Sequence, residues 1–583
     1  MSTTKHYATI EKPWMKYYDM VSDEDHLPQC TLYELVKERS RSFHFENETA
    51  LFYYGAEITF SKMFEIIDQY AAAFSCIGVK QGEAVSLISP TLPESVCILY
   101  ALNKIGAVAN IIDPRTDKSH TLEFIKKAKS RVLVTLEMCY KHVNAHLDEL
   151  GLDYVICIDP SASLPPLKRF GYRLKCAKYD IPYDGKRILR VADFFESASG
   201  KSVESVKYEP GMPAVITRTG GTTGISKGVV LTNDSMNAVA ANFYLTIPNP
   251  IVKDKYIQSF LNFVPLAASY GIVVSTHMSM TMGLKNIMIP NFNPDKFDKM
   301  VLAFKPRHII GVPVIYEKLI YSPKMKGKDL SFISTMAAGG DSASESLEDK
   351  LDEFRISHNI KYPIAQGYGL SEVSSACSFG FRDVHKKGSV GLPCYFNTIA
   401  AFEPDTENEL PIGEIGEICI SGPTVMKEYL DEPEETASVL RTHRDGRKWV
   451  HSGDLGYIDD DGFLFIVGRI KRAIIRGDGH KVFPLQLEKI VLRHPAVENC
   501  AVIGVRDRDY SSCCHLPLIC AELNDSNADK DTIRNELIQL CADNIEKRSM
   551  PAGVVFVGKI PLTGLMKNDY KALEAEYENY NYK

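Results

Sequence analysis

The sequence predicts an α/β protein: a large N-terminal domain with mostly parallel sheets flanked by helices plus a small β region, followed by a small α+β domain. Strand and helix patterns alternate from the N-terminus to residue 115 and resume later, which is typical of a parallel sheet covered by helices on both faces. After Gly388 short strands and turns replace this alternation. From Arg472 to Lys583 about a hundred residues carry their own helix and strand patterns, which suffices for a second domain.

The N-terminal elements follow one another in a regular order. Helical spacing of apolar residues, with glycines closing two of the segments, predicts helices, and short apolar runs predict strands. The predicted helices are 31–40, 61–78 and 93–106; the predicted strands are the hairpin 50–60 and the segments 84–89, 107–114, 131–136, 154–159, 308–313 and 332–340. Residues 159–209 are richer in Pro, Lys, Arg and Ser, and we expect a surface excursion there.

The C-terminal third changes character twice. Short strands separated by turns predict a compact β region at 400–404, 413–422 and 449–469. The last domain is expected to contain helices at 484–495 and 531–545, with strands at 473–476, 499–505, 517–523 and 553–557.

Composition argues against several classes of protein. The formal net charge of −7, without a basic stripe, argues against a nucleic-acid-binding protein. No stretch of roughly 18 uncharged apolar residues is present, and the N-terminus lacks the apolar core of a signal peptide, so we expect no transmembrane segment and a cytoplasmic location. The 14 scattered cysteines contain no C-x-x-C pair and are expected to be reduced.

One segment suggests a phosphate. Thr217–Lys227 places three glycines and four threonines around one lysine, between two apolar runs. Successive bare amides and hydroxyls form a nest for an anion, and Lys227 adds a positive charge. It is not a Walker A loop, because Ser226 precedes the lysine. A plain hairpin between two strands is the alternative.

Further motifs carry a family resemblance. They are Gln366–Glu372 (QGYGLSE), Trp449–Gly456 (WVHSGDLG), Gly468–Glu488 with its basic start, and Ile560–Asp569 (IPLTGLMKND). In this order and spacing, together with the glycine-rich segment, the chain resembles the adenylate-forming superfamily of acyl-CoA synthetases, luciferases and peptide-synthetase adenylation domains, from about residue 30 to residue 575.

The resemblance implies an AMP-binding domain with an acyl pocket at 1–467, a hinge at 468–471 and a mobile lid domain at 472–583. It also implies a reaction in two steps. A carboxylate attacks the α-phosphate of Mg·ATP to give an acyl-adenylate and pyrophosphate, and a thiol, usually that of CoA, then displaces AMP. Rotation of the mobile domain separates the two steps.

By this resemblance, residues of both domains hold the triphosphate and catalyse adenylation. Ser371, where the family usually has Thr, reaches the α-phosphate; Glu372 binds Mg²⁺; Lys567 stabilises the charge that develops between carboxylate and phosphate. The expected β- and γ-phosphate ligands are Thr219, Gly220, Gly221, Thr222, Thr223, Gly224 and Lys227. Met566 stands where the family usually has Gly before the catalytic lysine, and an exposed turn lysine is the alternative for Lys567.

The resemblance places the nucleoside and the thiol as well. Tyr368 stacks on adenine and Asp454 grips both ribose hydroxyls, with a core tyrosine and a surface ion-pair carboxylate as the respective alternatives. The remaining assigned residues are Gly340 and Asp341 beside adenine, Arg469 on the ribose, Lys471 at the hinge and Gly479 beside the pantetheine arm of CoA. A plain turn glycine is the alternative for Gly479.

The substrate is the least determined part. Ala268 stands where the family often has an aromatic or His gate to the acyl pocket, which leaves room for a bulkier acid. The leading hypothesis is an ATP-dependent acid–CoA ligase for an apolar monocarboxylic acid. The alternatives are a stand-alone enzyme that loads an acyl or aminoacyl group onto a separate carrier protein, and a non-catalytic nucleotide-binding relative.

Overall fold

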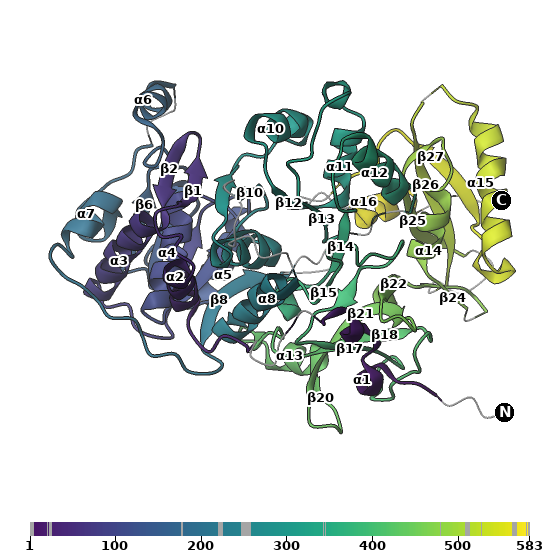
Figure 1. Ribbon diagram of the computed structural model, residues 1–583, viewed down its shortest axis with the longest axis horizontal. Helices are drawn as coiled ribbons and strands as arrows, with labels where there is room; N and C mark the ends of the chain where they lie inside the picture. The colour runs from purple at the N-terminus through teal and green to yellow at the C-terminus, as the bar shows by residue number, and fades with distance from the viewer. Residues whose placement is uncertain are drawn as a thin grey trace.

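The structure is a computed structural model that describes residues 5–19, 21, 26–175, 179–219, 226–246, 258–341, 343, 345–478, 480–507, 514–525, 527–562, 568–578 and 580. Figure 1 shows helices and sheets of the N-terminal part on one side and the C-terminal elements, in yellow, on the other. None of the helices in these ranges is long and apolar enough to cross a bilayer.

Two large sheets form the centre of the N-terminal part. In the described chain the first has eight strands in the order β19 (Glu428–Tyr429), β9 (Gly228–Thr232), β8 (Pro213–Arg218), β4 (Val108–Ile112), β3 (Ala84–Ile88), β5 (Val132–Leu136), β6 (Tyr154–Ile158) and β7 (Ile188–Arg190). The second has nine: β16 (Leu392–Pro393), β15 (Ser378–Phe379), β14 (Ala365–Tyr368), β13 (Thr335–Ala338), β12 (His308–Gly311), β10 (Ser259–Asn262), β11 (Lys285–Met288), β1 (Thr49–Tyr53) and β2 (Ala56–Thr59). The inner pairs are parallel, and antiparallel pairs occur toward three of the four sheet edges, while β7 at the fourth edge is parallel to its neighbour.

Helices cover these sheets. They include α2 (Leu32–Ser42), α3 (Phe60–Cys76), α4 (Pro93–Lys104), α5 (Lys118–Lys127), α6 (Pro166–Lys175), α7 (Val191–Glu196), α8 (Asn233–Thr246), α10 (Phe297–Phe304), α11 (Pro313–Ile320), α12 (Glu345–Ser357) and the π-helix Tyr270–Met278. Helix α2 begins at a capping box, in which Thr31 and Glu34 bond each other's backbone amides. Every residue of α4 is buried, so this helix is part of the core rather than a surface helix.

The segment 159–209 departs from the expectation of a surface excursion. Helix α6 does project from the sheets at the upper left of Figure 1. However, β7 pairs in parallel with β6 and extends the eight-stranded sheet. Ile188 and Leu189 point to opposite faces of the sheet and both are buried, so both faces of β7 are covered even though the segments around it are polar.

The β region packs into the main apolar core, and the C-terminal elements follow it in the chain. The former contains β17 (Thr398–Phe402), β18 (Gly416–Ser421), β20 (Leu440–Thr442), β21 (Lys448–Ile458) and β22 (Leu464–Arg469), with α13 (Pro433–Val439) beside it. The latter contains β23 (Ile474–Ile475), β24 (Lys481–Val482), α14 (Pro484–Val491), β25 (Val497–Arg506), β26 (His515–Leu523), α15 (Lys530–Asn544), β27 (Gly553–Val557) and α16 (Tyr570–Glu576). These C-terminal elements enclose apolar clusters of their own. The boundaries 467, 468–471 and 472 remain predictions.

Charged groups lie where the C-terminal elements meet α11 and α12. Lys489 donates to the Ile466 carbonyl at 3.2 Å, and Arg493 pairs with Glu345 at 3.5 Å. Burial, and then the charge of Glu498 on β25, raise the pKa of Glu317 on α11 to about 7. An ionised Glu317 therefore opposes this contact.

We predict that Glu317→Gln flattens the pH dependence of stability. Because the folded pKa lies above the ordinary value of 4.5, the carboxyl's contribution to the free energy of unfolding is complete below pH 4.5 and is lost as pH rises through about 7. The variant should therefore raise the thermal midpoint at pH 8 more than at pH 5, measured by circular dichroism. Glu353→Gln, at an exposed position of α12, is the matched control. Equal shifts at both pH values would contradict this assignment.

Candidate active site

The candidate site lies where parallel strands of both large sheets end. Strand β8 ends at Arg218, directly before Thr219; β13 ends at Ala338, before the Gly339–Gly340 pair; and β14 ends at Tyr368. Residues after all three ends line one cavity of about 1830 Å³. Ligands of parallel α/β sheets bind at this edge, where the loops diverge and leave a crevice.

A buried carboxylate connects three predicted site residues. Asp454 on β21 accepts a hydrogen bond from Tyr368 Oη at 2.7 Å and one from Arg469 Nε at 2.7 Å. The Asp454 side chain is 5% exposed, while that of Arg469 is 60% exposed. The ion-pair alternative thus describes a contact that is present, but its carboxylate is buried behind Tyr368 and Arg469, which line the cavity, rather than on the surface.

The turn that presents Asp454 is held from behind by Glu417 on β18. Its Oε1 accepts the Gly453 amide at 3.0 Å, and its Oε2 accepts from His451 Nδ1 at 2.9 Å. The far nitrogen of that ring lies 3.0 Å from His443 Nε2. Burial by itself raises the pKa of the Glu417 carboxyl, but the hydrogen bond and charge of His451 outweigh it and leave the pKa below its usual value.

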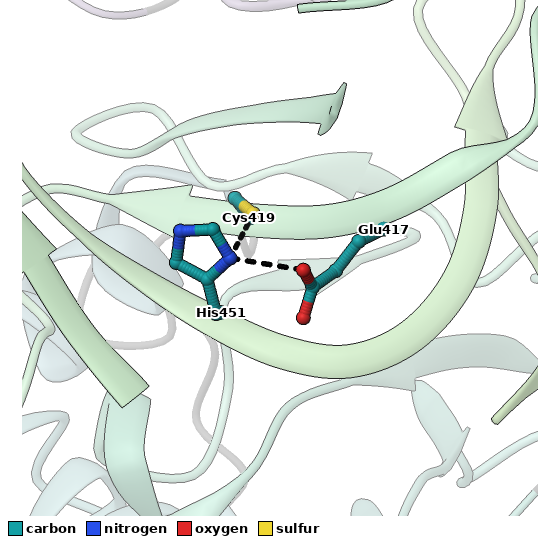
Figure 2. A group of neighbouring side chains, drawn as sticks. All are labelled: Glu417, Cys419 and His451. Atoms are coloured by element: carbon teal, nitrogen blue, oxygen red, sulfur yellow. Dashed lines mark hydrogen bonds and ion pairs between the residues drawn. The ribbon is translucent and has the colours of Figure 1, made fainter. Parts of the chain in front are cut away.

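Glu417, Cys419 and His451 also form a group with metal-ligand chemistry (Figure 2). Their donor atoms lie within 4.8 Å of one another, and all three side chains are buried. Burial, and then the Glu417 charge, raise the pKa of the Cys419 thiol. Glu417 accepts hydrogen bonds from the Gly453 amide and from His451, and this support of the Gly453 backbone explains why the side chains lie together.

Glu372 lines the cavity and lies in the short helix Ser371–Val373. Its Oε1 accepts a hydrogen bond from Tyr429 Oη at 2.6 Å. The Lys227 ammonium lies 4.9 Å from the centre of the Tyr429 ring and pairs with Glu435. Tyr429 thus links the expected metal ligand to the lysine at the end of the glycine-rich segment, a link that the sequence analysis missed.

Ser371 contacts residues of two distant sequence segments. Its Oγ donates to the Arg218 carbonyl at 3.2 Å and lies 3.2 Å from Ser269 Oγ. The turn before it needs glycine, because a Cβ on Gly369 would lie 1.6 Å from the Ser375 carbonyl oxygen. The segment Gln366–Glu372 therefore places the ring, the hydroxyl and the carboxylate on the same cavity.

Arg218 is a further cavity residue that sequence analysis missed. Its guanidinium donates to Asn110 Oδ1 at 2.6 Å and lies 4.4 Å from the centre of the Phe124 ring. Burial lowers its pKa to about 10, and its Nε has no hydrogen-bond partner among the described residues. An arginine at the end of an otherwise apolar strand, directly before the Thr219 loop, is the signal in the sequence.

The other predicted residues are placed as follows. Gly340 lines the cavity with φ +82°, and Asp341 beside it is exposed. Lys471 is exposed, and its charge, together with Lys227, lowers the pKa of Glu435. Ala268 lines the cavity wall before the π-helix.

Several predicted site residues belong to the glycine-rich segment and to other segments outside the described part of the chain. Thr219 and Lys227 directly follow and precede the paired strands of a hairpin, because β8 and β9 are antiparallel and pair Arg218 with Gly228. The hairpin geometry is therefore present, whereas the phosphate-binding hypothesis remains a prediction. The following positions lie outside the described residues: Gly220, Gly221, Thr222, Thr223, Gly224, Gly479, Met566 and Lys567.

Away from these polar groups the cavity wall is apolar. Its lining there includes Phe243, Phe263, Leu266, Phe292 and Phe379. Small molecules bind in such sites mainly by burying apolar surface, with a few polar groups that fix their orientation.

Comparison with known proteins agrees with this geometry. The family model of AMP-binding enzymes matches residues 39–430, and that of the AMP-binding enzyme C-terminal domain matches residues 486–567. A long-chain-fatty-acid–CoA ligase of Bacillus subtilis is 28% identical over 581 residues, covering 98% of this chain and all of that protein. A probable 4-coumarate–CoA ligase of Dictyostelium discoideum is 28% identical over 452 residues, covering 76% of this chain and 78% of the relative.

Solved structures share the fold. An ATP-bound RpMatB–BxBclM chimera superposes with a TM-score of 0.80 at 22% identity, covering 95% of this chain and all of the other. ATP-bound MatB from Rhodopseudomonas palustris gives a TM-score of 0.77 at 21% identity, covering 94% of this chain and all of the other.

We predict that Asp454→Asn raises the Kd for ATP about tenfold or more, because the ribose loses a charged acceptor and Arg469 loses its partner. Isothermal titration calorimetry measures the change. Asp460→Asn, an exposed position in the same β21–β22 hairpin, should leave the Kd unchanged. Equal affinities of the two variants would remove Asp454 from the nucleotide site.

Proposed function

Because the chain belongs to the family of AMP-binding enzymes, we propose that it activates an apolar carboxylic acid with Mg·ATP and transfers the acyl group to CoA. The membership confirms the resemblance seen in the motifs, the α/β fold class and the enzyme type, an AMP-forming acid–thiol ligase. The proposal adds residue roles, the metal and the substrate class.

One observation carries the proposal. A single cavity joins the polar groups Tyr368, Ser371, Glu372 and Arg469 to an apolar wall. The polar groups suit the nucleotide and the reacting carboxylate, and the apolar side chains suit the hydrocarbon of an acid. One cavity of about 1830 Å³ therefore offers contacts for both substrates of an adenylation.

In the first step a carboxylate oxygen of the acid forms a bond to the α-phosphorus of ATP, and the bond to pyrophosphate breaks. Ser371 would donate to the α-phosphate, and Lys567 would supply positive charge where negative charge accumulates. Arg218 lines the same cavity, and its side chain would add a second cation there. Thr219, Lys227 and the glycine-rich segment would hold the leaving pyrophosphate.

The residues present suit a magnesium ion. Glu372 lines the cavity, and its Oε1 accepts the hydrogen bond from Tyr429, so its carboxylate is available as an oxygen ligand there. One carboxylate with phosphate oxygens and water is the usual protein site for this ion. When bound, Mg²⁺ neutralises phosphate charge and orients the triphosphate.

The second step transfers the acyl group. The sulfur of CoA forms a bond to the acyl carbon, and the bond from that carbon to AMP breaks. Lys471 at the hinge and Gly479 would accompany a rotation of the C-terminal domain that replaces Lys567 by the thiol. Loading of a separate carrier protein uses the same chemistry with another thiol.

The decisive experiment measures pyrophosphate release from Mg·ATP across a panel of carboxylic acids, with and without CoA. We expect release with long-chain fatty acids or aryl acids, acceleration by CoA, and acyl-CoA by mass spectrometry. Release that is insensitive to CoA would favour carrier loading. Binding of ATP without release from any acid would favour a non-catalytic relative and contradict the proposal.

A lysine pair tests the catalytic assignment. Lys567→Ala should lower the rate of adenylation by about a hundredfold or more, because the charge that stabilises the transition state is lost. The Kd for ATP should change less than the rate. Lys571→Ala, on the first turn of α16, is the matched control and should retain the wild-type rate. Equal rates in the two variants would exclude Lys567 from catalysis.

A further inference from the structure

Helix α6 exposes an apolar face to solvent. Leu167, Phe170 and Leu174 are 89%, 67% and 70% exposed. Their spacing of three and four residues places them on one side of the helix. Large apolar side chains are exposed singly on most proteins, but a row of three on one helix face indicates a surface that another phase or molecule covers.

The same segment is strongly basic. Five basic and no acidic residues lie between Pro166 and Tyr179, in a chain whose net charge is −7. Arg169 donates to the Ser161 carbonyl at 3.0 Å, and Arg173 pairs with Asp159 at 3.0 Å. These contacts fasten the helix to the loop before it and leave the apolar face outward.

Helix α6 also forms part of the cavity wall. Lys168, Gly171 and Tyr172 line the cavity, and the Lys168 ammonium donates to the Tyr54 carbonyl at 2.5 Å. Tyr54 and Met138, which line it too, are themselves exposed apolar side chains. The cavity that reaches Ser371 and Glu372 therefore opens beside the exposed face of α6.

We propose that the face formed by Leu167, Phe170 and Leu174 docks the protein on an anionic lipid surface. An amphipathic helix with a basic polar side lies in the interface of such a membrane, with its apolar side chains below the headgroups. If the proposed function holds, an apolar acid then passes from the lipid directly into the cavity beside α6. The docking itself does not depend on that function.

A second copy of the chain is the less fitting occupant. One face of a ten-residue helix offers far less than the roughly 800 Å² per partner of a stable interface. Two such helices, with four basic residues each, would also bring eight basic residues together. An anionic bilayer instead complements the charge and accepts the apolar side chains.

The test is cosedimentation of the full-length protein with vesicles of equimolar phosphatidylcholine and phosphatidylglycerol. We expect binding that weakens in high salt and on vesicles of phosphatidylcholine alone. The triple variant Leu167→Ser, Phe170→Ser and Leu174→Ser should lower the vesicle affinity about tenfold or more. A matched triple variant, Ile10→Ser, Ile356→Ser and Ile415→Ser, removes three exposed isoleucines elsewhere and should bind as the wild type does.

Two readouts separate the possible outcomes. Pyrophosphate release with a short water-soluble acid should be equal in wild type and both triple variants, which shows that the variants fold and tests the proposed function separately. Equal vesicle binding by wild type and the α6 variant, or binding by neither, would overturn the docking proposal. Self-association of the wild type in sedimentation velocity, lost in the α6 variant and without vesicle binding, would overturn it in favour of a second copy.

Discussion

The carboxylate of Asp454 connects the parts of the molecule that the candidate chemistry needs. Tyr368 approaches it from the nine-stranded sheet and Arg469 from the strand that leads into the predicted hinge. A buried charge is stable only when its partners are present, because desolvation otherwise outweighs the pairing. The position of this carboxylate therefore depends on the correct packing of the β region against the large sheet.

That packing is supported by a second buried acid. Glu417 binds the backbone of the turn at Gly453 and the ring of His451, so the turn that carries Asp454 is fixed by its neighbours rather than by its own sequence. Glycine contributes the required backbone, with φ +69° at Gly453. The site thus combines a carboxylate that its neighbours hold in place, Asp454, with a C-terminal domain to which the proposed function assigns a rotation.

The cavity combines polar and apolar side chains. Arg218, Ser371 and Glu372 supply charge and hydrogen bonds, and several phenylalanine side chains supply apolar surface. Such a combination suits a molecule that has an ionised head and an apolar body. Helix α6 contributes Lys168, Gly171 and Tyr172 to the same lining, which relates substrate entry to the lipid-facing proposal by position alone.

Local patterns in the sequence determined most of the elements and the family. Apolar runs predict buried strands and capping residues such as Thr31 predict helix starts, because these features act within a few residues. Glycine-bearing motifs likewise led to the predicted site residues Tyr368, Ser371, Glu372, Asp454 and Arg469. Tyr429 and Glu417 carry no such local signal. Their roles arise from contacts across 57 residues between Glu372 and Tyr429 and 36 between Glu417 and Gly453. Only the tertiary structure decided those partners, the edge strand β7 and the exposed face of α6, since burial and pairing depend on which distant segments the fold brings together.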